Sequence, residues 1–143
     1  MRKIAILIPA WQPDQHLATL VFSLLALGFM QILIVNDGSD QLHARAIGTC
    51  LIDSRVRAMT HAVNIGKGRA LKTGLNEILT AYSGLLGLVT CDADGQHLPE
   101  EILAVAKALA ATPDRLILGC RTFQGNVPWR SRFGNSLTRA CFA

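Results

Sequence analysis

Two aspartates, Asp92 and Asp94, follow an apolar run in LVTCDADGQHLPEE and are separated by one residue. They could simply end a strand, because Asp and Gly are common turn residues. Two carboxylates this close repel each other unless a cation lies between them, and carboxylate oxygens are preferred ligands of Mg²⁺ and Mn²⁺. We therefore predict a divalent cation held by Asp92, Asp94 and Gln96. Such a cation could offset the negative charge of a bound phosphate group.

Another carboxylate, Asp37, lies in IVNDGSD at the end of a second apolar run. At the carboxyl edge of a strand it could accept a hydrogen bond from the ring N–H of uracil or guanine, or from ribose hydroxyls. The alternative is a turn followed by a helix cap from Ser39 or Asp40. Both interpretations can hold, because the cap and Asp37 are different residues.

Two further segments carry residues suited to a nucleotide. In NIGKGRALKTG, Lys67 stands between glycines at the start of an expected helix, where Gly66, Lys67 and backbone N–H groups could receive a diphosphate. The segment does not match the Walker A pattern, and a solvated helix start is the alternative. In IPAWQP, Pro9 and Trp11 could form a wall for a stacked base, although a rigid loop with an exposed aromatic residue explains them equally well.

A basic segment, CRTFQGNVPWRSRFGNSLTR, lies near the carboxyl end of the chain. Its arginines, among them Arg121, Arg130 and Arg132, could bind a phosphorylated substrate, because guanidinium groups bind phosphate in a bidentate manner. A solvated basic face is the alternative. The sequence lacks the interleaved basic and aromatic run of single-strand binders, so we predict no nucleic-acid partner.

The elements that position these residues alternate between apolar strands and amphipathic helices. This order predicts βαβ crossovers and an α/β fold, a mostly parallel sheet with helices on both faces. Ligands bind such sheets at the carboxyl ends of their strands, where the residues above are expected. The strands are expected at residues 3–10, 31–37, 56–61, 84–92 and 115–121, and the helices at 13–28, 41–52, 69–83 and 98–112.

Length and composition are consistent with one domain, residues 1–143. The uncharged run from Leu17 to Val35 is long enough to cross a bilayer, but Gly28 divides it, and we predict a buried helix followed by a buried strand. The four cysteines form no C-x-x-C pair, which argues against a zinc site and indicates a reducing compartment. Cys91 and Cys120 lie in apolar runs and are expected to be buried.

Taken in order, IPAWQP, VNDGSD, NIGKGRALKTG, DADGQHLPEE and GCRTFQGNVPWRSRFGN resemble family 2 glycosyltransferases with the GT-A (Rossmann-like) fold. The resemblance is strongest to the branch that transfers sugars to polyprenyl phosphates. It implies a metal-dependent, inverting transfer from a UDP- or GDP-sugar. It also implies a cytoplasmic location at the inner face of the cytoplasmic membrane, with possible peripheral membrane contact. A homo-oligomer is possible for a different reason, because a truncated domain would expose apolar surface.

The resemblance assigns roles to individual residues. The donor would be bound by Pro9, Ala10, Trp11, Asp37, Gly66, Lys67 and Asp92. Catalysis and the metal would depend on Asp92, Asp94 and Gln96, and the acceptor phosphate on Arg121, Arg132 and Ser136. Alternatives are transfer to a saccharide hydroxyl, which needs a general base, and a nucleotide-sugar-binding remnant. The remnant is considered because the chain is short for the family, as if its catalytic domain were truncated at the carboxyl end.

Overall fold

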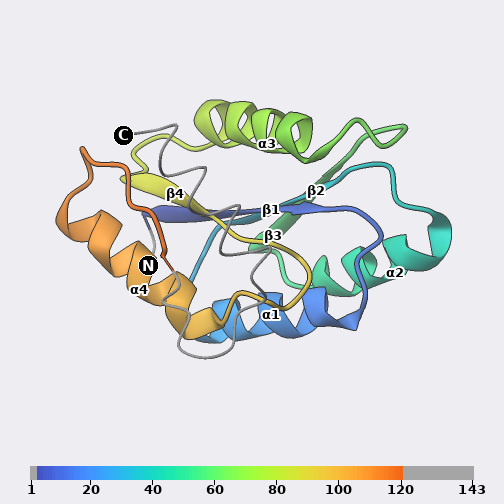
Figure 1. Ribbon diagram of the computed structural model, residues 1–143, viewed down its shortest axis with the longest axis horizontal. Coiled ribbons are helices and arrows are strands. Elements are labelled where there is room, and N and C mark those ends of the chain that lie inside the picture. Colours follow the sequence, from blue (N-terminus) through green and yellow to red (C-terminus); the bar gives the residue numbers. More distant parts are fainter. Residues whose placement is uncertain (1–2, 121–143) are drawn as a thin grey trace, which may run out of the picture.

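The computed structural model describes residues 3–120, and its centre is a parallel sheet (Figure 1). The sheet has the strand order β3-β2-β1-β4, and every neighbouring pair is parallel. The predicted α/β class is therefore confirmed. In chain order the elements are β1 (Ile4–Ala10), α1 (Gln15–Ala26), β2 (Ile32–Asn36), α2 (Gln41–Cys50), β3 (Val56–Thr60), α3 (Lys67–Ala81), β4 (Gly87–Thr90) and α4 (Pro99–Ala111).

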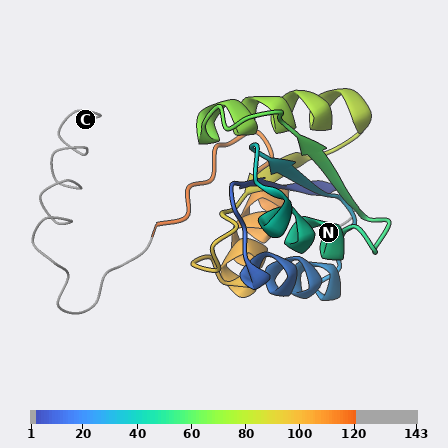
Figure 2. The same ribbon diagram turned by 90° about the vertical axis from the view of Figure 1, so that its right-hand side faces the viewer.

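Helices cover both faces of the sheet, as Figure 1 and Figure 2 show: α1, α2 and α4 lie on one face and α3 on the other. Side chains of a strand point alternately to opposite faces. Accordingly, Ile6 and Ile8 of β1 pack into the core beneath α1 and α4, whereas Leu7 packs with Ala70 and Ile78 of α3. All residues of β1 are buried, which explains why its sequence is apolar throughout rather than alternating.

The uncharged run from Leu17 to Val35 forms α1 and β2, as predicted. Gly28, with φ of +88°, lies just beyond the helix, and Phe29 is fully buried beside it. Between residues 3 and 120, no helix has both the length and the apolar content needed to cross a bilayer.

The fifth strand expected at 115–121 is wrong for the residues described, because 115–120 form no strand. The segment passes close to α4, because a Cβ on Gly119 would lie 3.6 Å from a methyl carbon of Val105. Leu116 and Leu118 are 84% and 72% exposed, and Cys120, expected to be buried, is exposed. Apolar composition predicted burial here, but no neighbouring strand supplies hydrogen bonds within the described chain.

Two other boundaries differ in ways that matter for the site. Helix α3 begins at Lys67, two residues earlier than expected, so the lysine belongs to its first turn. Strand β4 is shorter than expected at both ends: a turn at Gly84, with φ of +75°, precedes it, and the strand ends at Thr90. Asp92 therefore lies on the loop that follows β4.

Candidate functional site

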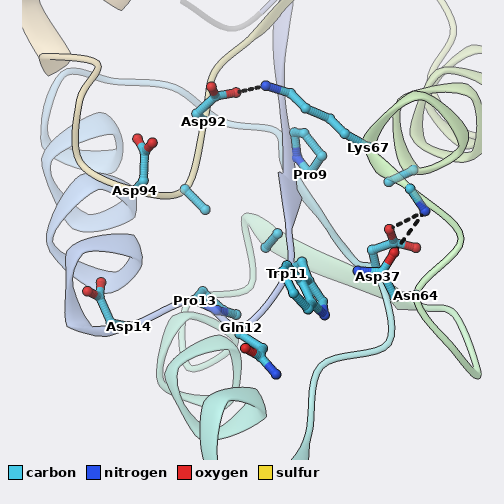
Figure 3. Close-up of a pocket in the computed structure, with 14 residues that line it drawn as sticks. Pro9, Trp11, Gln12, Pro13, Asp14, Asp37, Asn64, Lys67, Asp92 and Asp94 are labelled. Carbon is cyan, nitrogen blue, oxygen red and sulfur yellow. Dashed lines mark hydrogen bonds and ion pairs between the residues drawn. The ribbon is translucent and has the colours of Figure 1, made fainter.

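A cavity of about 480 Å³ opens beside the carboxyl ends of the strands (Figure 3). Its volume is typical of small-molecule sites. It is lined from the end of β1, the end of β2, the start of α3 and the loop after β4. The structure brings together around it these residues singled out from the sequence: Pro9, Ala10, Trp11, Asp37, Gly66, Lys67, Asp92 and Asp94.

The remaining predicted residues have different positions. Gln96 lies on the same loop as Asp94, and its backbone N–H donates to the Asp94 carboxylate at 3.0 Å, but it does not line the cavity. Arg121, Arg132 and Ser136 lie outside the described residues.

One wall of the cavity is formed by the segment that follows β1. Trp11 is 58% exposed, which leaves an aromatic face available to a stacked ligand. The backbone N–H of Gln12 donates to the hydroxyl of Ser39 at 2.9 Å, and Asp37 N–H donates to the carbonyl of Ala10 at 2.8 Å. These bonds tie the Trp11 segment to the turn after β2.

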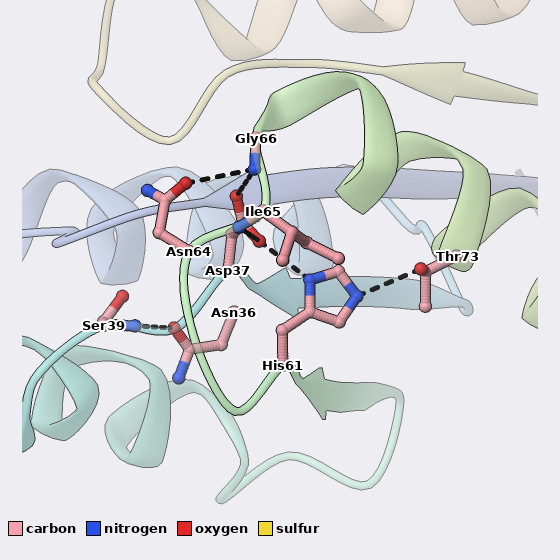
Figure 4. A network of polar contacts seen from close by, with 8 residues as sticks. All are labelled: Asn36, Asp37, Ser39, His61, Asn64, Ile65, Gly66 and Thr73. Carbon is pink, nitrogen blue, oxygen red and sulfur yellow. Dashed lines mark hydrogen bonds and ion pairs between the residues drawn. The ribbon is translucent and has the colours of Figure 1, made fainter.

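Asp37 is the most buried ionisable residue of the cavity, with 2% of its surface exposed. Its carboxylate accepts backbone N–H bonds from Ile65 at 3.0 Å and Gly66 at 2.8 Å, and a bond from the ring of His61 at 2.8 Å (Figure 4). Burial alone raises the pKa of Asp37, but these hydrogen bonds together outweigh it and hold the pKa below its ordinary value. The residue therefore stays ionised and fixes the loop that leads into α3.

Lys67 and Asp92 face each other across the cavity, and their Nζ and Oδ1 atoms lie 2.7 Å apart (Figure 3). The loop carrying Asp92 is held by a second contact, since Asp92 N–H donates to Nδ1 of His97 at 3.0 Å. The neighbouring thiol of Cys91 has its pKa raised to about 12, first by burial and then by the charge of Asp92. Cys91 is thus an inert core residue.

The charge of the lining is strongly negative, since the described lining residues include four aspartates, Asp14, Asp37, Asp92 and Asp94, and one lysine. An anionic phosphate would be repelled here unless a cation offset these carboxylates. Among residues 3–120 no cluster of three or more His, Cys, Asp or Glu could hold a metal by itself. Two carboxylates still fit Mg²⁺ or Mn²⁺, which commonly complete their coordination with water and substrate phosphates.

Sequence reasoning missed Asp14, which lines the cavity, and three residues that contact other site residues: His61, Asn64 and His97. His61 and Asn64 contact Asp37 and Gly66 respectively, and His97 contacts Asp92. His61 directly follows β3, so the rule that identified Asp37, a polar residue at the carboxyl end of a parallel strand, could have identified it as well.

Comparison with known proteins finds one matching family and three similar proteins. The sequence pattern of Glycosyl transferase family 2 matches residues 5–139. Polyprenol monophosphomannose synthase of Mycolicibacterium smegmatis is 33% identical, over 96% of this chain and 55% of that protein. UDP-N-acetylglucosamine–dolichyl-phosphate N-acetylglucosaminyltransferase of Methanococcus voltae is 27% identical, over 92% and 59%. An uncharacterized protein of Methanocaldococcus jannaschii is 29% identical, over 93% and 54%. The chain thus spans somewhat more than half the length of these relatives.

Proposed function

Because the chain belongs to glycosyl transferase family 2, as its motifs predicted, we propose that it transfers a sugar from a UDP- or GDP-sugar to a polyprenyl phosphate. The acceptor class is suggested by two relatives, one named as a polyprenol monophosphomannose synthase and the other as a dolichyl-phosphate N-acetylglucosaminyltransferase. Transfer would take place at the inner face of the cytoplasmic membrane, where such a lipid presents its phosphate.

One observation carries the proposal: the base-stacking, nucleoside-binding and diphosphate-binding candidates line a single cavity. Trp11 offers an exposed aromatic face to a base, and Asp37 offers a buried carboxylate to its N–H groups. Lys67 and the backbone at Gly66 stand at the amino end of α3, which favours a diphosphate.

Asp92 and Asp94 would hold Mg²⁺ or Mn²⁺ together with the donor diphosphate, with Gln96 near them on the same loop. The cation would act as a Lewis acid on the leaving diphosphate. Lys67 would then exchange its bond with Asp92 for one with a phosphate oxygen, and His97 would keep the backbone of Asp92 in place.

The acceptor phosphate needs no general base, because its oxygen is already ionised and can attack the anomeric carbon directly. Attack from the side opposite the diphosphate forms the new carbon–oxygen bond and inverts the anomeric centre. The electron pair of the broken bond leaves with the nucleoside diphosphate. Arg121, Arg132 and Ser136 are the residues we predict for the acceptor phosphate.

The test has a binding step and a transfer step. Thermal shift of the purified chain with UDP and GDP, with and without Mn²⁺, should show stabilisation that needs both metal and nucleotide. Asp94→Ala should abolish the metal-dependent part, whereas Asp114→Asn, an exposed aspartate outside the cavity, should not. Radiolabel transfer from a nucleotide-sugar to a polyprenyl phosphate then tests the reaction. Nucleotide binding that is independent of metal and unchanged in Asp94→Ala would refute the metal site.

A further inference from the structure

We propose that His61 is a positioning residue that keeps Asp37 a pure hydrogen-bond acceptor, so that the pocket selects nucleobases with a ring N–H over bases with a bare ring nitrogen at that place. The inference rests on the proposed function, because it concerns the nucleoside end of the same cavity. His61 itself does not line that cavity, and it acts through Asp37.

A chain of hydrogen bonds joins Asp37, His61 and Thr73 (Figure 4). Nδ1 of His61 lies 2.8 Å from Oδ1 of Asp37, and Nε2 lies 3.0 Å from the hydroxyl of Thr73. The His61 and Asp37 side chains are only 14% and 4% exposed. Contacts at this depth are little screened by solvent, and their geometry is fixed by β2, β3 and α3 together.

The direction of these bonds follows from their chemistry. An ionised carboxylate has no proton to donate, so Nδ1 of His61 carries the hydrogen in its bond with Asp37. In the neutral ring, Nε2 is then an acceptor, and the hydroxyl of Thr73 donates to it. With the ring neutral, the order is therefore Thr73 O–H to His61, and His61 N–H to Asp37.

Thr73 differs from the other threonines of the described helices in a way that supports this direction. Thr19, Thr49 and Thr80 donate their hydroxyls to the carbonyl four residues earlier in the same helix. The helix C-cap residue Thr112 does the same. The hydroxyl of Thr73 lies instead beside the ring of His61. The local bond that helical threonines commonly make is replaced here by one that orients an imidazole.

With Ile65, Gly66 and His61 all donating to it, the Asp37 carboxylate has about one of its four acceptor positions left for a ligand. That position can accept the N3–H of uracil or the N1–H of guanine. It repels the lone pair of the corresponding nitrogen in cytosine or adenine. Without the His61 donor, a buried carboxyl can take up a proton or turn, and either change lets it accommodate such a base.

The experiment measures binding of paired nucleotides to the full chain by calorimetry in Mn²⁺: UDP against CDP, and GDP against ADP. We expect the wild-type chain to prefer the N–H member of at least one pair by about tenfold or more. His61→Leu should reduce that preference to about threefold or less. His61→Asn should largely retain it, because an amide can donate from the position of Nδ1.

His43→Leu is the matched control. Nδ1 of His43 lies 2.7 Å from a carboxylate oxygen of Asp40, but this pair is at the more exposed start of α2. Its loss should leave the preference unchanged. Thr73→Val, which removes only the hydroxyl donor, should lower the preference even if His61→Leu fails to fold. Side-chain ¹⁵N shifts of the wild-type chain should show His61 protonated at Nδ1 and bare at Nε2.

The outcomes separate this inference from the proposed function. Equal weakening of both members of a pair in His61→Leu and Thr73→Val would mean that His61 only supports the loop, and it overturns the inference, as does an Nε2–H tautomer. A chain that transfers sugar but shows no preference, or one insensitive to His61, retains the function and loses the inference. A chain that shows the His61-dependent preference but transfers no sugar retains the inference and loses the proposed function.

Discussion

The ammonium group of Lys67 lies 2.7 Å from Oδ1 of Asp92, so that the first turn of α3 is linked to the loop after β4 across the mouth of the cavity (Figure 3). The side chains are 60% and 36% exposed. An ion pair this accessible stabilises a fold by about 1 kcal/mol or less. Its two members are therefore available to other partners, Asp92 to a cation and Lys67 to a phosphate.

This pairing predicts that Lys67 competes with the metal when no nucleotide is present. In Lys67→Gln the carboxylate of Asp92 loses the ammonium group that it pairs with. Mn²⁺ without nucleotide should therefore bind about two- to fivefold more tightly. The affinity is measured from the free Mn²⁺ signal in electron paramagnetic resonance. Binding of UDP or GDP should weaken in the same variant, because the diphosphate loses a charged partner.

Lys72→Gln provides the control for net charge. Lys72 is an exposed residue of the same helix that does not line the cavity, so its replacement should leave both affinities near the wild-type values. If Lys67→Gln and Lys72→Gln raise Mn²⁺ affinity equally, the effect comes from overall charge rather than from the contact with Asp92.

A close backbone approach at Gly38 joins the turn after β2 to the loop before α3. Gly38 has φ of +72°, and a Cβ there would overlap the backbone of Val63 and Asn64. Gly38→Ala should therefore push the two segments apart and weaken nucleotide binding as well as lower the melting temperature. Gly28 has a similar positive φ but open space around it. Gly28→Ala should therefore cost only about 1–2 kcal/mol of stability and leave nucleotide binding unchanged. Equal effects of both substitutions on nucleotide affinity would contradict this.

The grouping of the cavity residues was predictable, because it depends on a general property of parallel sheets. Asp37 and Asp92 follow β2 and β4, which flank β1, and the carboxyl ends of these strands meet at one edge. The starts of α2 and α4 were also readable from local chemistry: Asp40 caps α2, and Pro99 stands in the first turn of α4.

What escaped prediction depends on contacts distant in sequence. The place of His61 at the end of β3 could be read from the sequence, but its contact with Asp37, 24 residues earlier, could not, because no local pattern identifies that partner. The expected strand containing Leu116 and Leu118 failed for a related reason. An apolar run indicates that a segment could be buried, but a strand also needs a neighbouring strand with which its backbone can form hydrogen bonds.

A second glycine, Gly74, sets how closely α3 packs on the sheet. A Cβ at this buried position would overlap Cδ1 of Leu7 and lie 3.0 Å from a methyl carbon of Val35. Leu7 is fully buried and cannot move aside, so Gly74→Ala should destabilise the fold by about 1–3 kcal/mol despite the better helix propensity of alanine. Gly48→Ala in α2 meets no atom and should stabilise by up to about 1 kcal/mol. Urea unfolding of both variants checks the opposite signs, and stabilisation by Gly74→Ala would show that α3 packs less closely.

The buried carboxylate of Asp37 should make stability depend on pH in acid. Its pKa is lowered in the folded protein, because burial raises the pKa but the hydrogen bonds from His61, Ile65 and Gly66 together lower it by a larger amount. The unfolded chain therefore binds a proton at higher pH than the folded one, and the contribution of Asp37 is fully present above the unfolded pKa of about 3.9. It is lost as the pH falls from there through the folded pKa.

Asp37→Asn removes this titration and places an amide donor among N–H donors, which should cost about 1–3 kcal/mol at neutral pH. The difference in unfolding free energy between the wild-type chain and Asp37→Asn, measured in urea, should be largest at pH 6–7 and shrink below about pH 4. Asp114→Asn, at an exposed position, should differ little from the wild-type chain throughout. A difference for Asp37→Asn that stayed constant from pH 7 to about pH 3 would mean that the hydrogen bonds to Asp37 do not favour its ionised form, and the acceptor role inferred for it would lose its physical basis.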